Sequence, residues 1–189
     1  MVDFQNVNFS YKNKSLLKGF NLSIKKGDRI CFFGESGIGK TTILRLITGL
    51  EKADSGSLIV EKGATFSVAF QEDRLLPFKT VGENISLFDN SGKGLEHLER
   101  LGLSGIEKLY PSQLSGGMAR RVSIARALSR DADIYLFDEA LSGLDAENEE
   151  AAAQHILNST KGKTFVMVSH NPRHAEMLGC RIIDLNKIL

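Results

Sequence analysis

The chain has 189 residues, 42% of them hydrophobic and 25% charged, and its 24 Lys and Arg against 23 Asp and Glu leave a formal net charge of +1. This length and composition are typical of a single globular domain and exclude a disordered or fibrous chain. The balanced charge argues against a polyanionic partner such as nucleic acid, and the apolar runs are shorter than the roughly 20 residues that a membrane-spanning helix needs.

The N-terminal sequence and the cysteines favour a cytoplasmic protein. The segment MVDFQNVNFSY has no basic flank followed by an apolar stretch, so we expect no secretory signal. Cys31 and Cys180 lie in apolar surroundings at unrelated spacing, which favours buried thiols over a disulfide or a metal site.

Periodicity in the first 70 residues predicts a β-rich layer and then a strand, a loop and a helix. Apolar residues alternate at the start of the chain, and a continuous apolar run precedes a glycine-rich segment and a helical spacing of Ile and Leu. The expected strands contain Phe4, Val7, Phe9, Leu22 and Ile24 and the ranges 30–33 and 57–70, and the expected helix spans 40–50.

The middle of the chain has helical apolar spacing, and the last third returns to an α/β order. Between residues 75 and 129 we interpret the pattern as a helical insertion, with helices over 81–88, 95–101 and 118–128. Continuous apolar runs after residue 133 are typical of buried parallel strands. The expected elements there are strands over 134–137, 164–168 and 181–185 and helices over 147–158 and 173–178.

Residues 34–41, GESGIGKT, match the phosphate-binding pattern G-x-x-x-x-G-K-S/T between a predicted strand and a predicted helix. Glycines let successive backbone N–H groups turn toward a phosphate, while the lysine supplies a positive charge and the Thr41 hydroxyl a magnesium ligand. Kinases, GTPases and ATPases share this loop, so it predicts nucleotide binding and leaves the reaction open. The residues expected to hold the nucleotide are Gly34, Ser36, Gly37, Gly39, Lys40, Thr41 and Thr42.

Two carboxylates follow the apolar run 134–137, at the strand end where parallel sheets bind their ligands. Consecutive strand residues point to opposite faces, so we expect the two acids to have different tasks. Asp138 is placed to hold Mg²⁺, and Glu139 to orient or deprotonate an attacking water. The alternative is a solvated acidic turn that merely ends a strand.

Gln71 and His170 also follow predicted strands. An uncharged amide at such a place can contact Mg²⁺ and water at once, and an imidazole on a neighbouring strand can reach the γ-phosphate. Either residue could equally be structural on this argument. His97, His155 and His174 have no such position, and we expect them on the surface.

Residues 114–118, LSGGM, precede a helical segment, which physically indicates either a second anion-binding helix N-terminus or an ordinary helix cap. With this segment the chain resembles the nucleotide-binding subunit of ABC (ATP-binding cassette) transporters, with Met118 in place of Gln in the LSGGQ signature. The resemblance covers essentially the whole chain and keeps the family's order. It rests on the phosphate loop, the segment 70–77 around Gln71, the signature, the acid pair, the turn 144–145 and His170.

The resemblance implies an α/β fold: a P-loop NTPase (RecA-like) core with an N-terminal antiparallel β layer and a helical subdomain inserted between the Gln loop and the signature. We expect residues 1–189 to form one ABC ATPase domain. The β layer and core would span about 1–71, the helical subdomain about 72–129, and the rest of the core 130–189. Only 19 residues follow His170, so we expect no C-terminal regulatory domain.

The resemblance also implies a head-to-tail dimer in which ATP lies between the phosphate loop of one subunit and the signature of the other. Ser115, Gly116 and Gly117 would then contact the γ-phosphate in trans. Tyr11 matches the aromatic residue that stacks on adenine, although it could also be an ordinary surface residue of a strand. Asp145 matches the loop that crosses the dimer interface.

The implied function is that of an ATPase subunit, paired with itself or a related ATPase, that uses ATP and Mg²⁺ to drive a separate transmembrane permease. It would lie on the inner face of the cell membrane through that permease, together with an extracytoplasmic solute-binding protein and without nucleic acid. Met118 and the segment 71–77 look like importers of nitrate, sulfonate, taurine or related solutes, whereas Ala140 and Gly143 depart from the usual Pro and Ala.

Three alternatives fit less well. A non-transport ABC-type ATPase acting on DNA or ribosomes usually carries coiled-coil arms, zinc modules or a second cassette, and none is recognisable here. An exporter often has its cassette fused to membrane helices. A small-molecule kinase leaves Ser115 and His170 unexplained.

Overall fold

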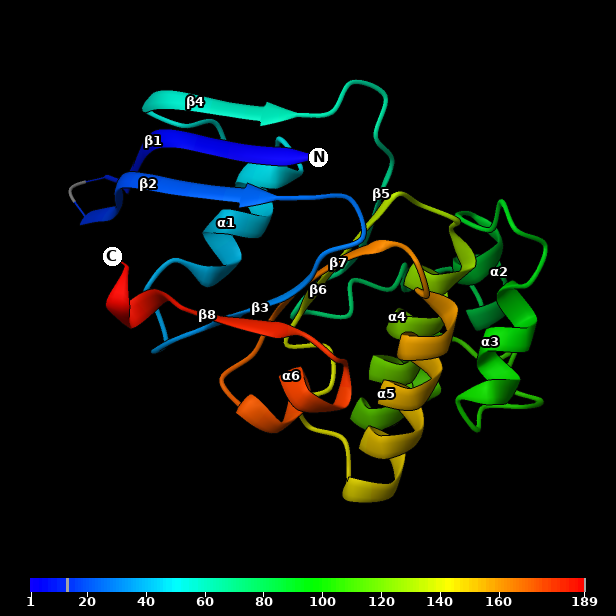
Figure 1. Cartoon of the computed structure of the whole chain (residues 1–189). Coiled ribbons are helices and arrows are strands. Elements are labelled where there is room, and N and C mark those ends of the chain that lie inside the picture. The colour runs from blue at the N-terminus through cyan, green and yellow to red at the C-terminus, as the bar shows by residue number, and fades with distance from the viewer. Residues whose placement is uncertain (13, 189) are drawn as a thin grey trace.

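The computed structural model describes residues 1–12 and 14–188. Two sheets lie one above the other with helix α1 (Lys40–Ile47) between them, and most of the other helices cover the far side of the larger sheet (Figure 1). This arrangement gives an α/β fold with an antiparallel and a parallel layer.

The smaller sheet consists of β1 (Val2–Tyr11), β2 (Lys14–Ile24) and β4 (Ser55–Val60) in the order β2-β1-β4, and both pairings are antiparallel. Phe4 and Val7 are both buried although three residues apart, because the register shifts between them and Asn6 has a φ of 51°. At this irregularity a Cβ on Gly56 would collide with the Asn6 carbonyl, so the sheet needs glycine there.

The larger sheet is parallel and has the order β5-β6-β7-β3-β8. Its strands are β3 (Arg29–Phe33), β5 (Phe66–Ala69), β6 (Ile134–Asp138), β7 (Thr164–Val168) and β8 (Arg181–Asp184). Every residue of β6 and β7 is buried, as the continuous apolar runs predict for strands covered on both faces.

The β-like range 57–70 does not form one element, so that part of the sequence interpretation is wrong. β4 belongs to the antiparallel sheet and β5 to the parallel sheet, and a turn containing Gly63 at φ 82° separates them. The Ala64 amide donates to the Glu61 carbonyl within this turn. Periodicity shows which residues are extended but does not show which sheet they join.

Alternation along the parallel strands supplies two hydrophobic cores. On β6, Ile134 and Leu136 face the core shared with α1 and the antiparallel sheet, while Tyr135 and Phe137 face the core shared with the helices on the other side. The sheet is therefore the common wall of both cores, and its strand ends are fixed from both faces.

The remaining helices are short except for two. They are α2 (Val81–Ser86), α3 (Gly94–Arg100), α4 (Gly116–Ser129), α5 (Ala146–Ser159) and α6 (Pro172–Met177), with 3₁₀ turns η1 (Pro111–Gln113) and η2 (Leu185–Lys187). The helix expected over 40–50 ends at Ile47 because Gly49 adopts a φ of 74°. Helices α2 and α3 pack against α4 and form the helical region at one side of the molecule (Figure 1).

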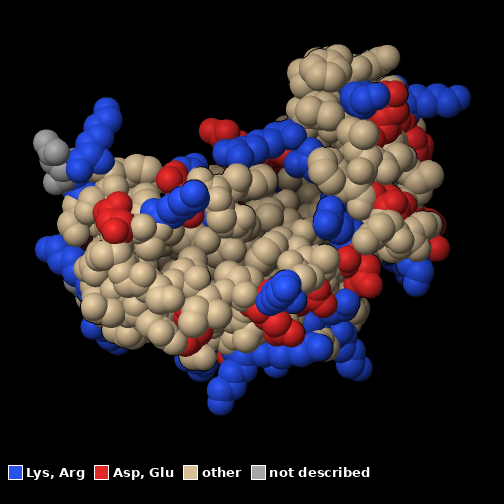
Figure 2. Space-filling view, turned by 90° about the horizontal axis from the view of Figure 1, so that it is seen from above, with Lys and Arg blue, Asp and Glu red and all other residues tan. Residues whose placement is uncertain are grey.

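The described residues contain no helix long and apolar enough for a bilayer, and within them Cys31 is buried, Cys180 is half-buried and both thiols are free. Figure 2 shows acidic and basic side chains interspersed around the edge of one face, with uncharged surface between them. The near-balance of charge in the sequence is therefore also a local balance on this face.

Candidate active site

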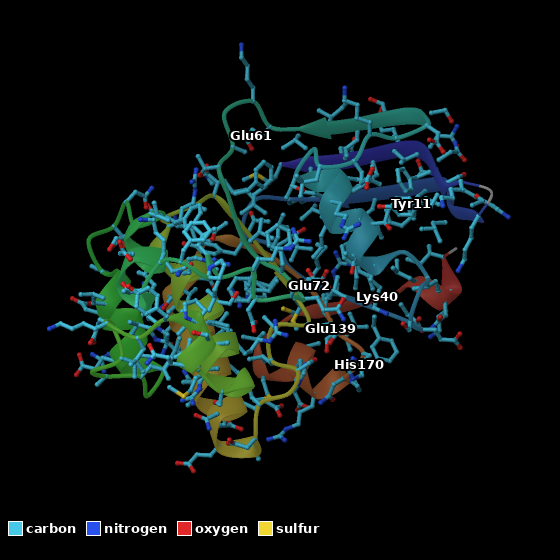
Figure 3. All side chains as sticks on the ribbon, turned by 180° about the vertical axis from the view of Figure 1, so that it is seen from behind. Tyr11, Lys40, Glu61, Glu72, Glu139 and His170 are labelled. Atoms are coloured by element: carbon cyan, nitrogen blue, oxygen red, sulfur yellow. The ribbon has the colours of Figure 1, made fainter. Side chains whose placement is uncertain are left out.

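The carboxyl ends of four parallel strands meet at one cavity of about 560 Å³. Segments following β3, β5, β6 and β7 contribute Lys40, Gln71, Glu139 and His170, because adjacent parallel strands end at the same edge of a sheet. In Figure 3 Lys40, Glu139 and His170 lie close together near one end of α1. The full lining is Tyr11, Lys14, Leu16, Ser36, Gly37, Gly39, Lys40, Thr41, Thr42, Gln71, Arg120, Asp138, Glu139, Ser142, Val168 and His170.

The glycine-rich loop joins β3 to α1. Gly37 and Gly39 have φ values of 77° and 117°, a region that favours glycine, and Gly39 is the N-cap of α1. The Lys40 ammonium is buried and donates to the carbonyls of Gly34 and Glu35, at 2.7 Å each. The loop therefore holds a fixed cation and the positive end of a helix at the same place, which suits a polyanionic phosphate chain.

Asp138 ends β6, and its Oδ1 atom is buried without a hydrogen-bond partner in residues 1–12 and 14–188. Burial raises the pKa of Asp138, Glu139 raises it further, and a hydrogen bond with Thr41 acts in the opposite direction. A buried carboxylate oxygen without a donor, beside a threonine hydroxyl, is a donor set of hard oxygens that fits Mg²⁺. The side chains of Asp138, Thr41 and Gln71 all line the cavity.

Glu139 has a left-handed backbone conformation with a φ of 51°, and its amide donates to the Val168 carbonyl. Its Oε1 lies 2.9 Å from Nδ1 of His170, and its Oε2 accepts from the Ser142 hydroxyl at 2.7 Å. Both acids line the cavity, and the strand alternation expected from the sequence is wrong: β6 ends at Asp138, so a turn separates Glu139 from the strand.

The other histidines are not surface residues as expected. His174 is buried between Ser169 and Glu149, and His97 and His155 are half-buried with Nδ1 of the first 2.9 Å from Nε2 of the second. Burial lowers the pKa of all three. Helix α5 packs against α6 and α6 against β3, and the rings of His97 and His155 meet between α3 and α5; sequence spacing revealed none of these contacts.

The backbone of the Gln71 segment is held by helix α4. Arg120 donates to the carbonyls of Phe70 and Gln71 at 3.1 and 2.6 Å, and Arg126 donates to those of Asp73 and Arg74 at 2.7 and 2.8 Å. Four charge-assisted hydrogen bonds therefore fix this segment to α4.

The signature segment does not reach the cavity of its own chain. Ser115 is the N-cap of α4 and accepts from the Met118 amide, and Ser115, Gly116 and Gly117 are absent from the cavity lining. Ser115 and Gly116 are exposed at the start of this helix. Asp145 likewise caps α5, where hydrogen bonds from Asn148 lower its pKa.

Tyr11 lies at the other end of the cavity, beside α1 (Figure 3). Its hydroxyl donates to Glu51 at 2.6 Å and accepts from Arg45 at 3.2 Å, and its ring meets Phe9 edge-on with 4.9 Å between centroids. These contacts fix the ring, which is 38% exposed and can be covered by a flat ligand group.

Sequence reasoning missed several residues of the cavity. Lys14 lies on β2 with its ammonium 3.4 Å from the Gly37 carbonyl, Ser142 bonds to Glu139, and Arg120 projects from α4. Of these only Arg120 and Ser142 lie near a recognisable motif. Lys14 follows Tyr11 by three residues, but nothing in the sequence shows that the start of β2 approaches the Gly37 loop, which is a tertiary contact.

Residues 17–142 match the family model described as ABC transporter. An aliphatic sulfonates import ATP-binding protein of Rhodococcus jostii (strain RHA1) is 37% identical over 97% of this chain and 78% of the relative. A spermidine/putrescine import ATP-binding protein of Mesoplasma florum is 33% identical over 99% of this chain and 59% of the relative. A solved dimeric ATP-binding cassette in a post-hydrolysis state, bound to ADP and Pi, is 30% identical and has a TM-score of 0.86 over 97% of this chain and 94% of its own.

These matches confirm both the family resemblance and the fold class that the motifs predicted. The family model covers two thirds of the chain, and the import ATP-binding relative aligns with almost all of it. The chain therefore belongs to the ABC transporter family.

Proposed function

We propose that this chain is an ATPase that works as one half of a head-to-tail dimer and drives a separate membrane permease importing a small solute. The observation that carries the proposal is the meeting of Lys40, Asp138, Glu139 and His170 at one cavity, while the signature at Ser115 faces outward. The names of the import relatives support the direction of transport.

In this proposal the loop 34–41 binds the phosphates of ATP. Its backbone N–H groups, the N-terminus of α1 and the Lys40 ammonium all present positive charge to the same place. Tyr11 stacks on the adenine, with its ring held by Glu51 and Arg45. Lys14 adds a second cation at the Gly37 side of the loop.

Asp138, Thr41 and Gln71 would hold Mg²⁺. When bound, the ion would neutralise charge that develops on the β- and γ-phosphates. The ion would also supply the partner that Asp138 Oδ1 lacks among the described residues, which would offset the cost of burying this carboxylate.

Glu139 would orient the attacking water and accept its proton. His170 and Ser142 hold the two carboxylate oxygens from opposite sides, so the carboxylate has one orientation before the water arrives. His170 is 69% exposed on its side chain, whereas Glu139 is only 12% exposed, so the imidazole covers the acid at the mouth of the cavity.

The second half of the ATP site would come from another copy of the chain. Ser115, Gly116 and Gly117 lie outside the cavity, at an exposed helix N-terminus that can bind an anion only across an interface. The dimeric structure of the related cassette supports this arrangement. Each chain would thus form one ATPase domain of the dimer, and residues 72–129 would form the helical subdomain of that domain.

The permease would dock on a groove of about 280 Å³ between the Gln71 segment and the helices. Phe66, Phe70 and Phe88 line this groove together with Arg74, Arg126 and Arg130, and the Nε atom of Arg130 is buried without a partner. Phe78 is 75% exposed on the loop between Gln71 and α2. Aromatic surface with an excess of guanidinium groups fits a short apolar segment that carries carboxylates.

Docking there would place the chain on the inner face of the cell membrane, and an extracytoplasmic solute-binding protein would complete the system. Sedimentation with membrane vesicles from the host cell tests the docking surface. Phe88→Ser, in the lining of the groove, should remain in the supernatant, whereas Leu95→Ser, at a similarly exposed site on α3 outside the groove, should sediment like the wild type. Equal sedimentation of both variants would contradict the assignment of the groove.

Glu139→Gln tests the ATPase proposal itself. The amide keeps the size of the side chain but cannot accept a proton, so hydrolysis should fall by about 10²–10⁴ while MgATP still binds. Size-exclusion chromatography with MgATP should show a stable dimer. The control is Glu150→Gln, which removes an exposed pairing with Arg173 and should leave turnover unchanged. A monomer with full turnover would refute the role of Glu139.

A further inference from the structure

We propose that Glu149, His174 and Ser169 form a buried relay that positions His170 against Glu139. The relay rests on the proposed function, because it acts on the turnover of ATP. All three residues lie outside the cavity lining, so they are positioning residues and touch neither the nucleotide nor the water.

The His174 imidazole lies between the other two side chains. Nδ1 of His174 lies 2.8 Å from the Ser169 hydroxyl, and its Nε2 lies 3.2 Å from Oε1 of Glu149. The Ser169 oxygen in turn accepts from the Asn171 amide at 3.0 Å. With a neutral His174, Nε2–H faces the carboxylate and Nδ1 accepts from the serine hydroxyl, whose other acceptor is the Asn171 carbonyl at 3.3 Å.

The relay connects the segments that carry the reacting groups. Ser169 is the residue before His170, and its amide donates to Phe32 of β3. Glu149 lies in the first turn of α5, four residues after Asp145, on the helix that follows the Glu139 loop. The imidazole of His174 on α6 bridges the two, so a shift of either segment changes the distance between His170 and Glu139.

The same residue types could in principle form a nucleophilic triad, but their burial excludes that role. Ser169 is 0% exposed, and its hydroxyl faces His174 within the protein. A substrate carbonyl cannot reach a hydroxyl that is fully buried. Burial therefore favours orientation of His170 over covalent catalysis.

The relay depends on the charge state of His174. The groups that face it are Glu149 from α5, Glu139 from the loop after β6 and His170 from the loop after β7. Burial lowers the pKa of His174 and outweighs the two carboxylates, which act in the opposite direction. Cys31 of β3 lies beside Ser169, and because burial raises the pKa of its thiol to about 12, it stays uncharged. At neutral pH Nδ1 of the uncharged imidazole can accept a hydrogen bond from the serine hydroxyl. Once His174 is protonated, Nδ1 carries a hydrogen and can no longer accept that bond.

Two replacements of His174 separate the two contacts. The oxygen of asparagine can take the place of Nδ1 and still accept from Ser169. The amide of glutamine instead reaches toward Glu149 and leaves Ser169 only the longer contact with the Asn171 carbonyl at 3.3 Å. His174→Gln and Ser169→Ala should each lower kcat about tenfold, the equivalent of one hydrogen bond, with KM for ATP changed by less than about twofold. His174→Asn should keep kcat within about threefold at pH 7.5.

The pH profile of ATP hydrolysis gives the second measurement. The activity of the wild type should fall on the acid side as His174 takes up a proton, and His174→Asn, which cannot titrate, should shift or lose that limb. His155→Asn is the control, because His155 lies on α5 and contacts His97 and not the His170 loop. It should keep both kcat and the acid limb at their wild-type values.

Combining Ser169→Ala with His174→Gln should lower kcat no further than the stronger single variant, because both break the same contact. Three results would refute the relay. The first is a kcat of the double variant that falls by the product of the two single losses, and the second is a wild-type kcat in both single variants. The third is a pH profile of His174→Asn with the same acid limb as the wild type. Failure of the ATPase proposal would give a different result: Glu139→Gln would hydrolyse ATP as fast as the wild type.

Discussion

Replacing Asn84 with alanine should destabilise the loop that presents Phe78. Asn84 is 0% exposed, and its side chain closes the loop 76–80 from inside. Its Oδ1 accepts from the Leu76 amide at 2.8 Å, and its Nδ2 donates to the carbonyls of Leu76, Lys79 and Thr80. No backbone group replaces the side chain as acceptor for the Leu76 amide.

The expected cost follows from which groups lose their only partner. The Leu76 carbonyl also accepts from the Lys79 amide, and the Thr80 carbonyl from the Asn84 amide, so these two stay paired. The Leu76 N–H and the Lys79 C=O are left without partners, and each part-buried group costs about 1–2 kcal/mol. The sum is about 2–4 kcal/mol, which in a chain of this size lowers Tm by about 4–16 °C.

Thermal unfolding followed by circular dichroism, with and without MgATP, measures this effect. Asn84→Asp is the sharper variant: it is isosteric, but at neutral pH its carboxylate faces three carbonyl oxygens, so it should unfold at a lower temperature than Asn84→Ala. The control is Asn158→Ala on the exposed side of α5, which should change the stability by less than about 0.5 kcal/mol. If Asn84→Ala and Asn158→Ala unfold at the same temperature, the hydrogen bonds of Asn84 do not hold the loop.

Two further predictions concern charge. Burial raises the pKa of Asp138, so its ionised form destabilises the folded chain at pH values above that pKa. Asp138→Asn should therefore raise Tm at pH 7.5 without Mg²⁺, and it should abolish Mg²⁺-dependent hydrolysis. A lower Tm would contradict this reasoning. Burial and the neighbouring His97 lower the pKa of His155 to about 4. Between about pH 6.5 and 4, His155 is therefore protonated in the unfolded chain and neutral in the folded chain. Stability should therefore fall as the pH drops through that window, and denaturant titrations of His155→Asn should show a flatter pH dependence than the wild type.

The sequence pattern predicted two kinds of element correctly: strands buried on both faces, and the strand and helix joined by the glycine-rich motif. The runs 134–137 and 164–168 are continuous and apolar because β6 and β7 have a core on each side. The glycine-rich loop was predictable because phosphate binding requires both its glycines and its position between a strand and a helix. The range 57–70 could not be divided correctly, because the choice between two sheets is made by tertiary pairing.

The residues of the candidate site also divide into those that the sequence predicts and those that depend on tertiary contacts. Strand-end residues such as Asp138 and His170 are predictable, because a parallel sheet gathers its carboxyl ends. The left-handed turn at Glu139 contains no glycine or asparagine that would indicate it in the sequence. The hydrogen bond that the Glu139 amide donates to the Val168 carbonyl joins two segments far apart in the sequence. Likewise the burial of His174 results from the packing of α5 and α6, which no periodicity in a six-residue helix can indicate.

The two sides of the cavity are held by different parts of the fold. Lys40, Asp138 and Glu139 belong to the loops of the parallel sheet, where the hydrogen bonds of Lys40 and Glu139 leave little freedom. The Gln71 segment is instead bonded through its carbonyls to Arg120 and Arg126 of α4, the helix whose N-terminus carries Ser115. Helix α4 therefore links the backbone of Gln71 to the signature. Because Arg126 also lines the groove assigned to the permease, a partner seated there acts on the same helix, and α4 is the element through which docking and the ATP site would influence each other.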